Sequence, residues 1–539
     1  MFKKYNLDIN THTFDDKGVK NFFWPLKIFS IDNFRDDILK ELIPLLKGNK
    51  NLLKDNSVKT PLNIMFKWFI IDILNVYKAA EIKKSFNEKN IKLEIPERFF
   101  FLKKIVNNEN PPTIFESLKK GPVERFSSIK FLKKIYRFFQ LNSFKDILSL
   151  NFSKKVVISY HSLVKKNLRN NKEINFFKNF SDFYIRKINY LPNSAENKIS
   201  KEVIKESEEV LKIIQTVFEK HNLEFKDNIK NHFFDWILQS YFFINFQKEN
   251  IKNLPNNIYT GSSASEVWGK ILCNFVITAG GHVTNLEHGR GDILHEFLPK
   301  YFTDLDDVSE FITLNKSHAD INNQRYFDNK ELILGNENTL IKYSRKNIDN
   351  PFKLNKNKKF KKKRSNKTLI GMYTSTCYLG YGGRLRTTLP DIVYYDFQIR
   401  LISDLQKLNK KVICKPHPEG RTKLNHNFFK KLDCIKISKN YDEAIKEYDF
   451  DFFITDHIAS TTMVDMILSN KPTILMNFGT PRICDDIKDD LEKSIFILDV
   501  EFNEENRAIY DNIKLKEILL KIEQNNFTNR DKPIKKYYN

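Results

Sequence analysis

The sequence predicts an α/β protein in which a mainly helical N-terminal extension precedes two domains built on parallel sheets. From about residue 156 onward, short apolar segments of strand length alternate with segments of helical period, as they do in parallel α/β folds. Several of these strands end in polar residues, and ligands bind at that edge of an open parallel sheet. A chain of 539 residues with 41% hydrophobic residues can form more than one core.

Residues 1–150 are assigned to the helical extension. Apolar residues recur at helical spacing over Asp36–Leu46 and Ile64–Val76. The basic, aromatic segments 99–106 and 131–139 either pack on a core as amphipathic helices or rest on a membrane face. The best candidate for a membrane span, Met65–Ala80, is interrupted by charged and polar residues, so no span is expected, and no signal peptide either.

Residues 151–350 are assigned to a first α/β domain, which would bind the acceptor in a two-substrate enzyme. Ser200–Lys220 and His232–Phe246 predict amphipathic helices, and 266–273 predicts a short one. The predicted strands are Val156–Tyr160, Ile258–Gly261, Asn274–Ile277, His282–Leu286 and Phe311–Leu314.

Residues 351–367 form a lysine-rich linker, and residues 368–539 are assigned to a second α/β domain, which would bind a nucleotide. The linker is expected to be solvated, with a phosphate or lipid headgroup contact as the alternative. Leu515–Ile522 predicts a C-terminal helix. The predicted strands are Thr368–Met372, Val412–Cys414, Cys434–Ile437, Phe452–Thr455, Thr473–Met476 and Ile495–Leu498.

The formal net charge of +23 favours acidic partners. No zinc module, helix-turn-helix or aromatic platform accompanies the charge, so peripheral contact with an anionic membrane is a more economical use of it than nucleic-acid binding. The five cysteines are widely spaced and form no ligand motif, which is typical of a reduced, cytoplasmic protein. We therefore expect a cytoplasmic protein, with the inner face of the cell membrane as an alternative location.

A cluster of hydroxyl residues follows the predicted strand Phe452–Thr455. Ser460, Thr461 and Thr462 open a segment of helical period, where free backbone N–H groups and the helix dipole favour a phosphate. Asp465 lies about one turn further on and is suited to accept hydrogen bonds from a ribose. The alternative is an ordinary capped helix, because serine and threonine are preferred N-caps.

A second candidate follows the strand Val412–Cys414. His417 stands between two prolines that fix the backbone, and its imidazole is suited to bind a phosphate or to act as an acid. Lys415, Glu419 and Arg421 add charged groups to the same loop. The alternative is a turn in which the histidine binds a neighbouring carbonyl.

A third candidate follows the strand His282–Leu286. In Glu287-His288-Gly289-Arg290-Gly291 the glycines allow a tight turn beside a ligand, and His288 is suited to take a proton from a hydroxyl. Glu287 or Asp292 would orient this histidine or serve as the base instead. A turn histidine without a chemical role is the alternative.

A fourth candidate follows the strand Thr368–Met372. Thr374 and Ser375 begin a loop rich in hydroxyl groups and glycine that is similar to a phosphate-facing loop, although it lacks the ending of a P-loop. A flexible loop between domains is equally compatible with this composition.

This arrangement resembles the GT-B glycosyltransferases, and more narrowly the bacterial enzymes that use CMP- or CDP-activated donors for surface polymers. These are the polysialyltransferases, the Kdo transferases and the CDP-glycerol glycerophosphotransferases. The resemblance rests on His417-Pro418, on Ser460-Thr461 with Asp465, and on His288-Gly289. It implies two Rossmann-like domains that face a cleft, with the donor phosphate on His417, Ser460 and Thr461 and a first-domain base, His288 or Glu287.

The function expected from this resemblance is transfer of a sugar or a polyol phosphate to a hydroxyl of a surface glycan, in capsule or lipopolysaccharide synthesis. No cofactor is expected, and no metal, because no suitable acidic motif stands out. The partners would be a nucleotide-sugar donor and a glycan or glycolipid acceptor, without nucleic acid. Two alternatives stay open: a nucleotide-sugar epimerase, and a non-catalytic basic protein that binds an anionic polymer or membrane.

Overall fold

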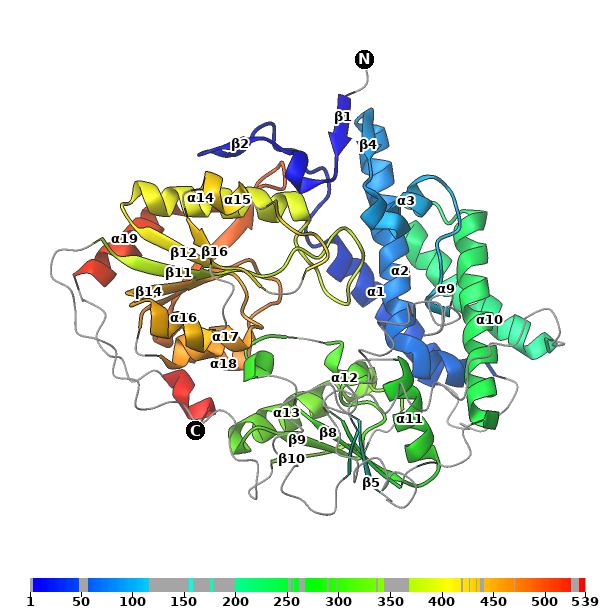
Figure 1. The fold of residues 1–539 in the computed structure, drawn as a ribbon. Helices are drawn as coiled ribbons and strands as arrows, with labels where there is room; N and C mark the ends of the chain where they lie inside the picture. The colour runs from blue at the N-terminus through cyan, green and yellow to red at the C-terminus, as the bar shows by residue number, and fades with distance from the viewer. Residues whose placement is uncertain are drawn as a thin grey trace, which may run out of the picture.

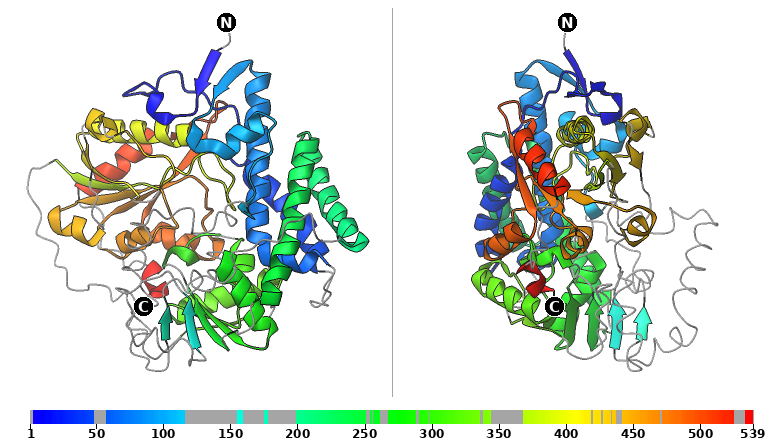
Figure 2. Two further views of the ribbon diagram at one scale, coloured as in Figure 1. Left: turned by 45° about the vertical axis from the view of Figure 1, so that its right-hand side comes forward. Right: turned by 90° about the vertical axis from the view of Figure 1, so that its left-hand side faces the viewer.

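The chain forms an α/β structure with parallel sheets and a helical N-terminal region, as the sequence predicts (Figure 1). Figure 2 shows these parts from two further sides. The computed structural model describes residues 3–47, 57–115, 155–158, 175–177, 199–250, 254, 256–260, 267–287, 290–296, 298–335, 338–343, 368–417, 420–425, 427–432, 434–436, 441–469, 471–524 and 533–538.

The helical region is held together by aromatic side chains. Phe34 stacks on Tyr77 with ring centroids 3.8 Å apart, and Phe69 lies 4.6 Å from Trp236. Both predicted helices near the N-terminus are confirmed, and 99–106 is largely helical, while 131–139 lies outside the described residues. The helices are α1 (Ser30–Lys47), α2 (Lys59–Glu88), α3 (Phe100–Val106), α9 (Lys201–Lys220) and α10 (Asp227–Asn250).

The first α/β region contains a sheet of six strands, all of them parallel. Its helices in the described residues are α11 (Val267–Thr278), α12 (Lys300–Thr303) and α13 (Lys316–Asp328). Across the sheet the strands are β10 (Leu340–Tyr343), β9 (Glu310–Thr313), β8 (His282–Leu286), β7 (Asn257–Thr260), β5 (Lys155–Ile158) and β6 (Asn175–Phe177).

One predicted strand in this region is wrong. Residues Asn274–Ile277 form the second half of helix α11, not a strand. Strands β7 and β8 are parallel neighbours, so the chain between them must cross over the sheet, and a helix is the usual way to do so. The apolar run in α11 faces the core below β7 and β8, where Val276 and Cys273 are fully buried. A short buried helix and a buried strand have the same composition, which is why the sequence pattern misled.

The second α/β region contains a sheet of seven strands, parallel except for the last. The predicted strand Phe452–Thr455 is confirmed residue for residue. Across the sheet the strands are β13 (Ile435–Lys436), β12 (Lys411–Lys415), β11 (Ile370–Thr374), β14 (Phe452–Thr455), β15 (Thr473–Asn477), β16 (Phe496–Phe502) and β17 (Ala508–Tyr510).

Helices cover both faces of this seven-stranded sheet (Figure 1). Phe452 and Ile454 belong to the core on one face and Phe453 to the core on the other, as the alternation of a strand requires. Helices α14 (Asp391–Lys407), α15 (Asn427–Lys431) and α19 (Asn512–Glu523) lie on the first face, and α16 (Tyr441–Glu447), α17 (Thr461–Leu468) and α18 (Asp485–Ser494) on the second.

The two α/β regions contact each other directly. His295 pairs with Ile483 in an isolated antiparallel bridge, and Arg325 donates to Asp486 at 2.7 Å. The C-terminal 3-10 helix η6 (Pro533–Tyr537) spans the same junction: the Tyr537 carbonyl accepts a hydrogen bond from Asn315 in the first region, and its hydroxyl donates to Asp490 in the second.

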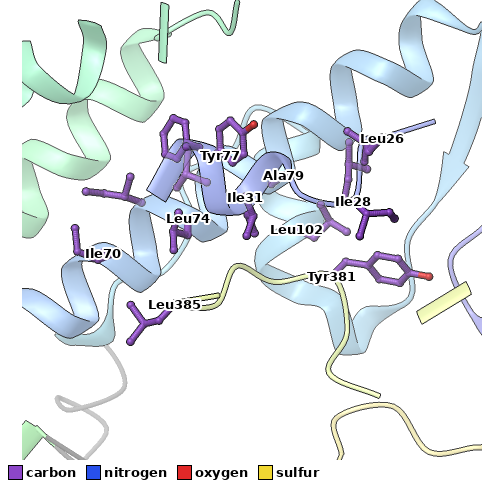
Figure 3. Packing of buried hydrophobic residues seen from close by; sticks show 14 of the residues in the cluster. Leu26, Ile28, Ile31, Ile70, Leu74, Tyr77, Ala79, Leu102, Tyr381 and Leu385 are labelled. Atoms are coloured by element: carbon purple, nitrogen blue, oxygen red, sulfur yellow. The ribbon is translucent and has the colours of Figure 1, made fainter. Parts of the chain in front are cut away.

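The helical region also packs against the second α/β region. The connection from β11 to α14 runs along α2, and Figure 3 shows Tyr381 and Leu385 of this connection among the buried side chains of the helices. Near the N-terminus, Val19 donates its backbone N–H to Asp396 of α14 at 2.9 Å. Short pairs complete the fold: β1 (Lys3–Asn6) with β4 (Ile91–Glu94), and β2 (Phe14–Asp15) with β3 (Gly18–Val19).

Among the described residues, no helix combines the length and the apolar character that crossing a bilayer requires. The predicted candidate Met65–Ala80 lies inside α2, where its buried residues pack within the protein. The predicted linker 351–367 lies outside the described residues.

Candidate functional site

The loop after β8 packs on the start of α17, so polar segments from the two sheets meet. The 3-10 helix η4 (Arg290–Ile293) follows β8, and a Cβ atom on Gly291 would lie 3.0 Å from the Ala459 carbonyl oxygen. Ile293 shares a buried cluster with Ile458 and Met463. Position 291 therefore favours glycine, because the two backbones approach each other too closely for a side chain. His288 and Gly289 lie outside the described residues, as does the side chain of Arg290.

The hydroxyl cluster lies at the N-terminus of α17, as predicted. Ser460 is the N-cap, and its Oγ accepts a hydrogen bond from the Thr462 backbone N–H at 3.2 Å. Thr461 is exposed, and Ser460, Thr462 and Asp465 are half-buried. Ser460 thus caps the helix, and Thr461 is the exposed residue at its start.

The end of β12 brings a further predicted residue to this area. His417 is half-buried, and it lies close enough to His457 to contribute to the low pKa of that ring. Lys415 at the end of β12 is also half-buried, and burial lowers the pKa of its ammonium group. Pro418 and Glu419 lie outside the described residues.

Two histidines that the sequence analysis overlooked complete the cluster. His457 lies two residues after β14, and His295 lies two residues after η4, where its Nδ1 donates to the Gly291 carbonyl at 3.1 Å. Burial, followed by the positive charge of Arg386, lowers the pKa of each to about 3, so both rings are neutral at neutral pH. The position of His457 at a strand end was a usable signal, whereas His295 reaches the site only through the contact between the two regions.

Arg386 and two further arginines supply the fixed positive charge of the site. Burial and the charges of Arg421 and Arg386 lower the pKa of Arg384. Burial also lowers the pKa of Arg386, which the carboxylates of Asp32 and Asp292 oppose. Arg384 thus lies within electrostatic reach of both Arg421 and Arg386, and Arg386 also acts on His295 and His457. Of the three, the sequence pattern pointed only to Arg421, as a charged group in the loop of His417.

The loop after β11 is fixed by a buried polar network rather than being free. Asp456 accepts hydrogen bonds from the hydroxyls of Tyr373 and Tyr394, and its second oxygen accepts from the Thr376 N–H at 2.9 Å. Gln398 donates to both tyrosine hydroxyls at 3.1 and 3.2 Å. Burial raises the pKa of Asp456 to about 6. This network holds the start of the loop against the end of β14.

The two predicted residues of this loop lie in different environments. Thr374 is buried at the end of β11, with its hydroxyl 3.5 Å from the Ile454 carbonyl. Ser375 is half-buried and donates its backbone N–H to the Lys415 carbonyl at 3.4 Å. The two are therefore at the same sheet edge as His417, with Ser375 the more accessible of the pair.

Glu287 is fully buried and paired. Its carboxylate accepts hydrogen bonds from His318 Nδ1 at 2.9 Å and from the Leu314 backbone N–H at 3.0 Å. Burial raises the pKa of Glu287, but the charge and hydrogen bond of His318 outweigh it, so the pKa lies below its usual range. The carboxylate thus links the end of β8 to the end of β9 and to α13.

The described residues contain no group of three or more His, Cys, Asp or Glu side chains with the arrangement of a metal site. Comparison with models of known protein families found no match to this chain, and neither did a search of curated proteins.

Proposed function

We propose that the protein is a glycosyltransferase, or a polyol-phosphate transferase, that uses a nucleotide-activated donor, with CMP or CDP as the nucleotide. One observation carries the proposal: the loop after β8 lies against the Ser460-capped start of α17, beside a cluster of neutral imidazoles and arginines. Such a group suits a phosphate that gains negative charge as it leaves a sugar.

In this proposal the two sheets belong to two Rossmann-like domains of the GT-B type, and the leaving phosphate binds on the second. His417, Ser460, Thr461 and Thr462 would donate hydrogen bonds to the phosphate, and Asp465 would accept them from the ribose. Thr374, Ser375 and Glu419 would border the donor. The mainly parallel order of both sheets and the contact between their carboxyl ends support this interpretation.

The reaction would be a direct displacement. A base removes the proton from an acceptor hydroxyl, the oxygen attacks the anomeric carbon, and the bond to the phosphate oxygen breaks with its electron pair on the nucleotide. For a polyol phosphate the attack would be at phosphorus. His288 or Asp292 is favoured as the base, since Glu287 is already bound to His318 and to the Leu314 amide.

The acceptor would be a glycan or glycolipid of a surface polymer, made at the inner face of the cell membrane. This part rests on the resemblance of the motifs to bacterial capsule and lipopolysaccharide enzymes, and on the net charge of +23.

The test is a thermal-shift titration with CMP, CDP, UMP, UDP and GDP, because a ligand of the folded state raises the unfolding temperature with its concentration. We expect CMP or CDP to stabilise the protein and His417→Ala to abolish the effect. His282→Ala is the matched control, since His282 lies at the opposite, amino end of β8 and is partly exposed. A folded protein that responds to no nucleotide contradicts the proposal and favours a binding protein.

A further inference from the structure

The segment 381–388 of the loop between β11 and α14 has two different faces. Tyr381, Leu385 and Thr387 are buried at 1%, 8% and 3% exposure, while Arg384 and Arg386 between them are half-buried. Figure 3 shows Tyr381 and Leu385 among the side chains of the helical region. Buried and half-buried residues alternate along this segment, so Arg384 and Arg386 are more accessible than the side chains that join the core.

Gly383 fixes the segment on α2. A Cβ atom at this position would lie 2.2 Å from the Leu74 carbonyl carbon and 2.4 Å from the Asn75 nitrogen, closer than any side chain can be. The backbone of the segment therefore touches the backbone of the helix. Because the helical region determines where this backbone lies, it also determines where Arg384 and Arg386 lie.

The arginine face carries more positive than negative charge: Asp32 and Asp292 act on Arg386, but neither forms an ion pair with it among the described residues. Arg384, Arg386 and Arg421 form no ion pair within 4.0 Å among the described residues, and the buried Nε of Arg384 has no hydrogen-bond partner there. Nη1 of Arg421 would lie 3.5 Å from a Cβ on Gly382, next to the segment. Asp32, the carboxylate of the helical region that acts on Arg386, already accepts hydrogen bonds from Arg35 and from the Thr387 N–H.

Two threonines of the same segment have buried hydroxyl groups that lack hydrogen-bond partners in the described part of the chain. The buried Oγ1 atoms of Thr387 and Thr388 have no hydrogen-bond partner among the described residues. The buried ammonium group of Lys78 on α2 feels the charge of Arg384 as well, and burial lowers the pKa of this lysine to about 8. Guanidinium groups stay charged, so crowding them together is costly unless an anion neutralises them.

We propose that Arg384, Arg386 and Arg421 form a binding site for a phosphate or carboxylate group, built on α2 of the helical N-terminal region. Arginine suits this ligand, because its planar fork matches two oxygens of either anion. The anion would belong to a substrate: either a second phosphate of the nucleotide donor or an acidic group of the acceptor. Only this assignment to a substrate rests on the proposed function; the anion site itself does not.

The test uses isothermal titration of the full chain with inorganic pyrophosphate and with inorganic phosphate, at constant ionic strength set by chloride. We expect saturable binding that weakens about tenfold or more in Arg384→Gln and in Arg386→Gln. Lys516→Gln, on the exposed surface of α19, removes the same charge and is expected to leave the affinity unchanged. A general effect of net charge would instead weaken all three variants equally, which would overturn the proposal.

The unfolding temperature without anion separates a ligand site from a structural one. If the arginines form an anion site, Arg384→Gln reduces the repulsion among their positive charges in the absence of the anion. The variant should then unfold at the same temperature as the parent protein or at a higher one. A large decrease in that temperature, together with unchanged pyrophosphate binding, overturns the proposal. The absence of saturable binding of either ion to the parent protein overturns it too.

The source of the anion follows from a second titration in the presence of saturating CDP. If pyrophosphate no longer binds, the site belongs to the donor; if it binds alongside CDP, the site belongs to an acidic acceptor, and galacturonate is the next probe. If no nucleotide binds but the pyrophosphate response persists and depends on Arg384, the proposed transferase function fails while the anion site stands.

Discussion

Gly291 and Ala459 join the two α/β regions at the candidate site: a Cβ on the glycine would lie 3.0 Å from the alanine carbonyl oxygen. Gly291 follows β8 of the six-stranded sheet, and Ala459 precedes α17 of the seven-stranded sheet. The loop that carries the predicted base and the helix start that carries the predicted phosphate ligands are therefore adjacent through their backbones. This adjacency can be tested by adding a single methyl group.

Substitution of alanine for three glycines is expected to destabilise the protein in a defined order. Gly383→Ala should cost most, since its Cβ would lie 2.2 Å from Leu74 backbone. Gly291→Ala should lower the free energy of unfolding by about 1–3 kcal/mol, as overpacking does. Gly420→Ala, with its nearest contact at 3.3 Å, is the control and should cost least. Urea unfolding measures the three values, and an equal loss in all of them contradicts the backbone contacts.

His457 should make the protein less stable in acid. Its pKa is lowered from 6.5 to about 3, so between these values the unfolded chain binds a proton that the folded chain does not. The contribution of His457 to the free energy of unfolding therefore rises with pH over that window and is constant above it. Between pH 4.5 and 7 the rise is on the order of 2 kcal/mol.

Replacement of His457 tests the direction of this pH dependence. His457→Gln should flatten the rise, measured by urea unfolding from pH 4 to 7.5. The same logic predicts that an anion near His457 and His295 favours their protonation, so phosphate binding should take up protons and tighten as the pH falls. Titration in buffers of different ionisation enthalpy measures that uptake; zero uptake places the anion away from these rings.

Asp456 should make the protein less stable as the pH rises, which is the opposite of the effect of His457. Burial raises its pKa from 3.8 to about 6, so the folded chain holds a proton that the unfolded chain releases. Its contribution to the free energy of unfolding falls by about 3 kcal/mol at most as the pH rises from 3.8 to 6, and it is constant above pH 6. Asp456→Asn should remove this fall. Unchanged pH dependence in the variant would mean that the carboxylate titrates normally in its network with Tyr373 and Tyr394.

The pair of Glu287 and His318 should contribute strongly to stability at neutral pH. The pKa of Glu287 is lowered, so its contribution is present above the ordinary value of about 4.5 and is lost as the pH falls through the folded value. Glu287→Gln leaves His318 buried with a weaker partner, and we expect a loss of about 3 kcal/mol at pH 7.

A second glutamate of the same sheet provides the control for this pair. Glu310 begins β9 and bonds to Lys342, which is 44% exposed, so Glu310→Gln should cost less than about 1 kcal/mol. Similar losses in the two variants would contradict the role assigned to the buried pair. If Glu287→Gln folds and keeps full transferase activity, Glu287 is not the base.

The sequence alone determined the features that depend on near neighbours along the chain. Alternating strands and helices predicted the parallel α/β organisation, and polar residues after Phe452–Thr455 predicted the capped start of α17. These patterns are readable because strand period, caps and turns involve residues a few positions apart. The same local view assigned Asn274–Ile277 to a strand, because only the parallel pairing of β7 and β8 requires a helix there.

Only the tertiary structure decided which polar groups pair with one another. His318 and Glu287 are 31 positions apart, and nothing local to either predicts that they bind each other. Arg386 acts on His295 and His457, and its segment packs on α2 at Gly383, a contact between parts far apart in the chain. Burial and charge pairing are properties of the packed molecule, so the grouping of the arginines depends on contacts between the helical region and the second sheet.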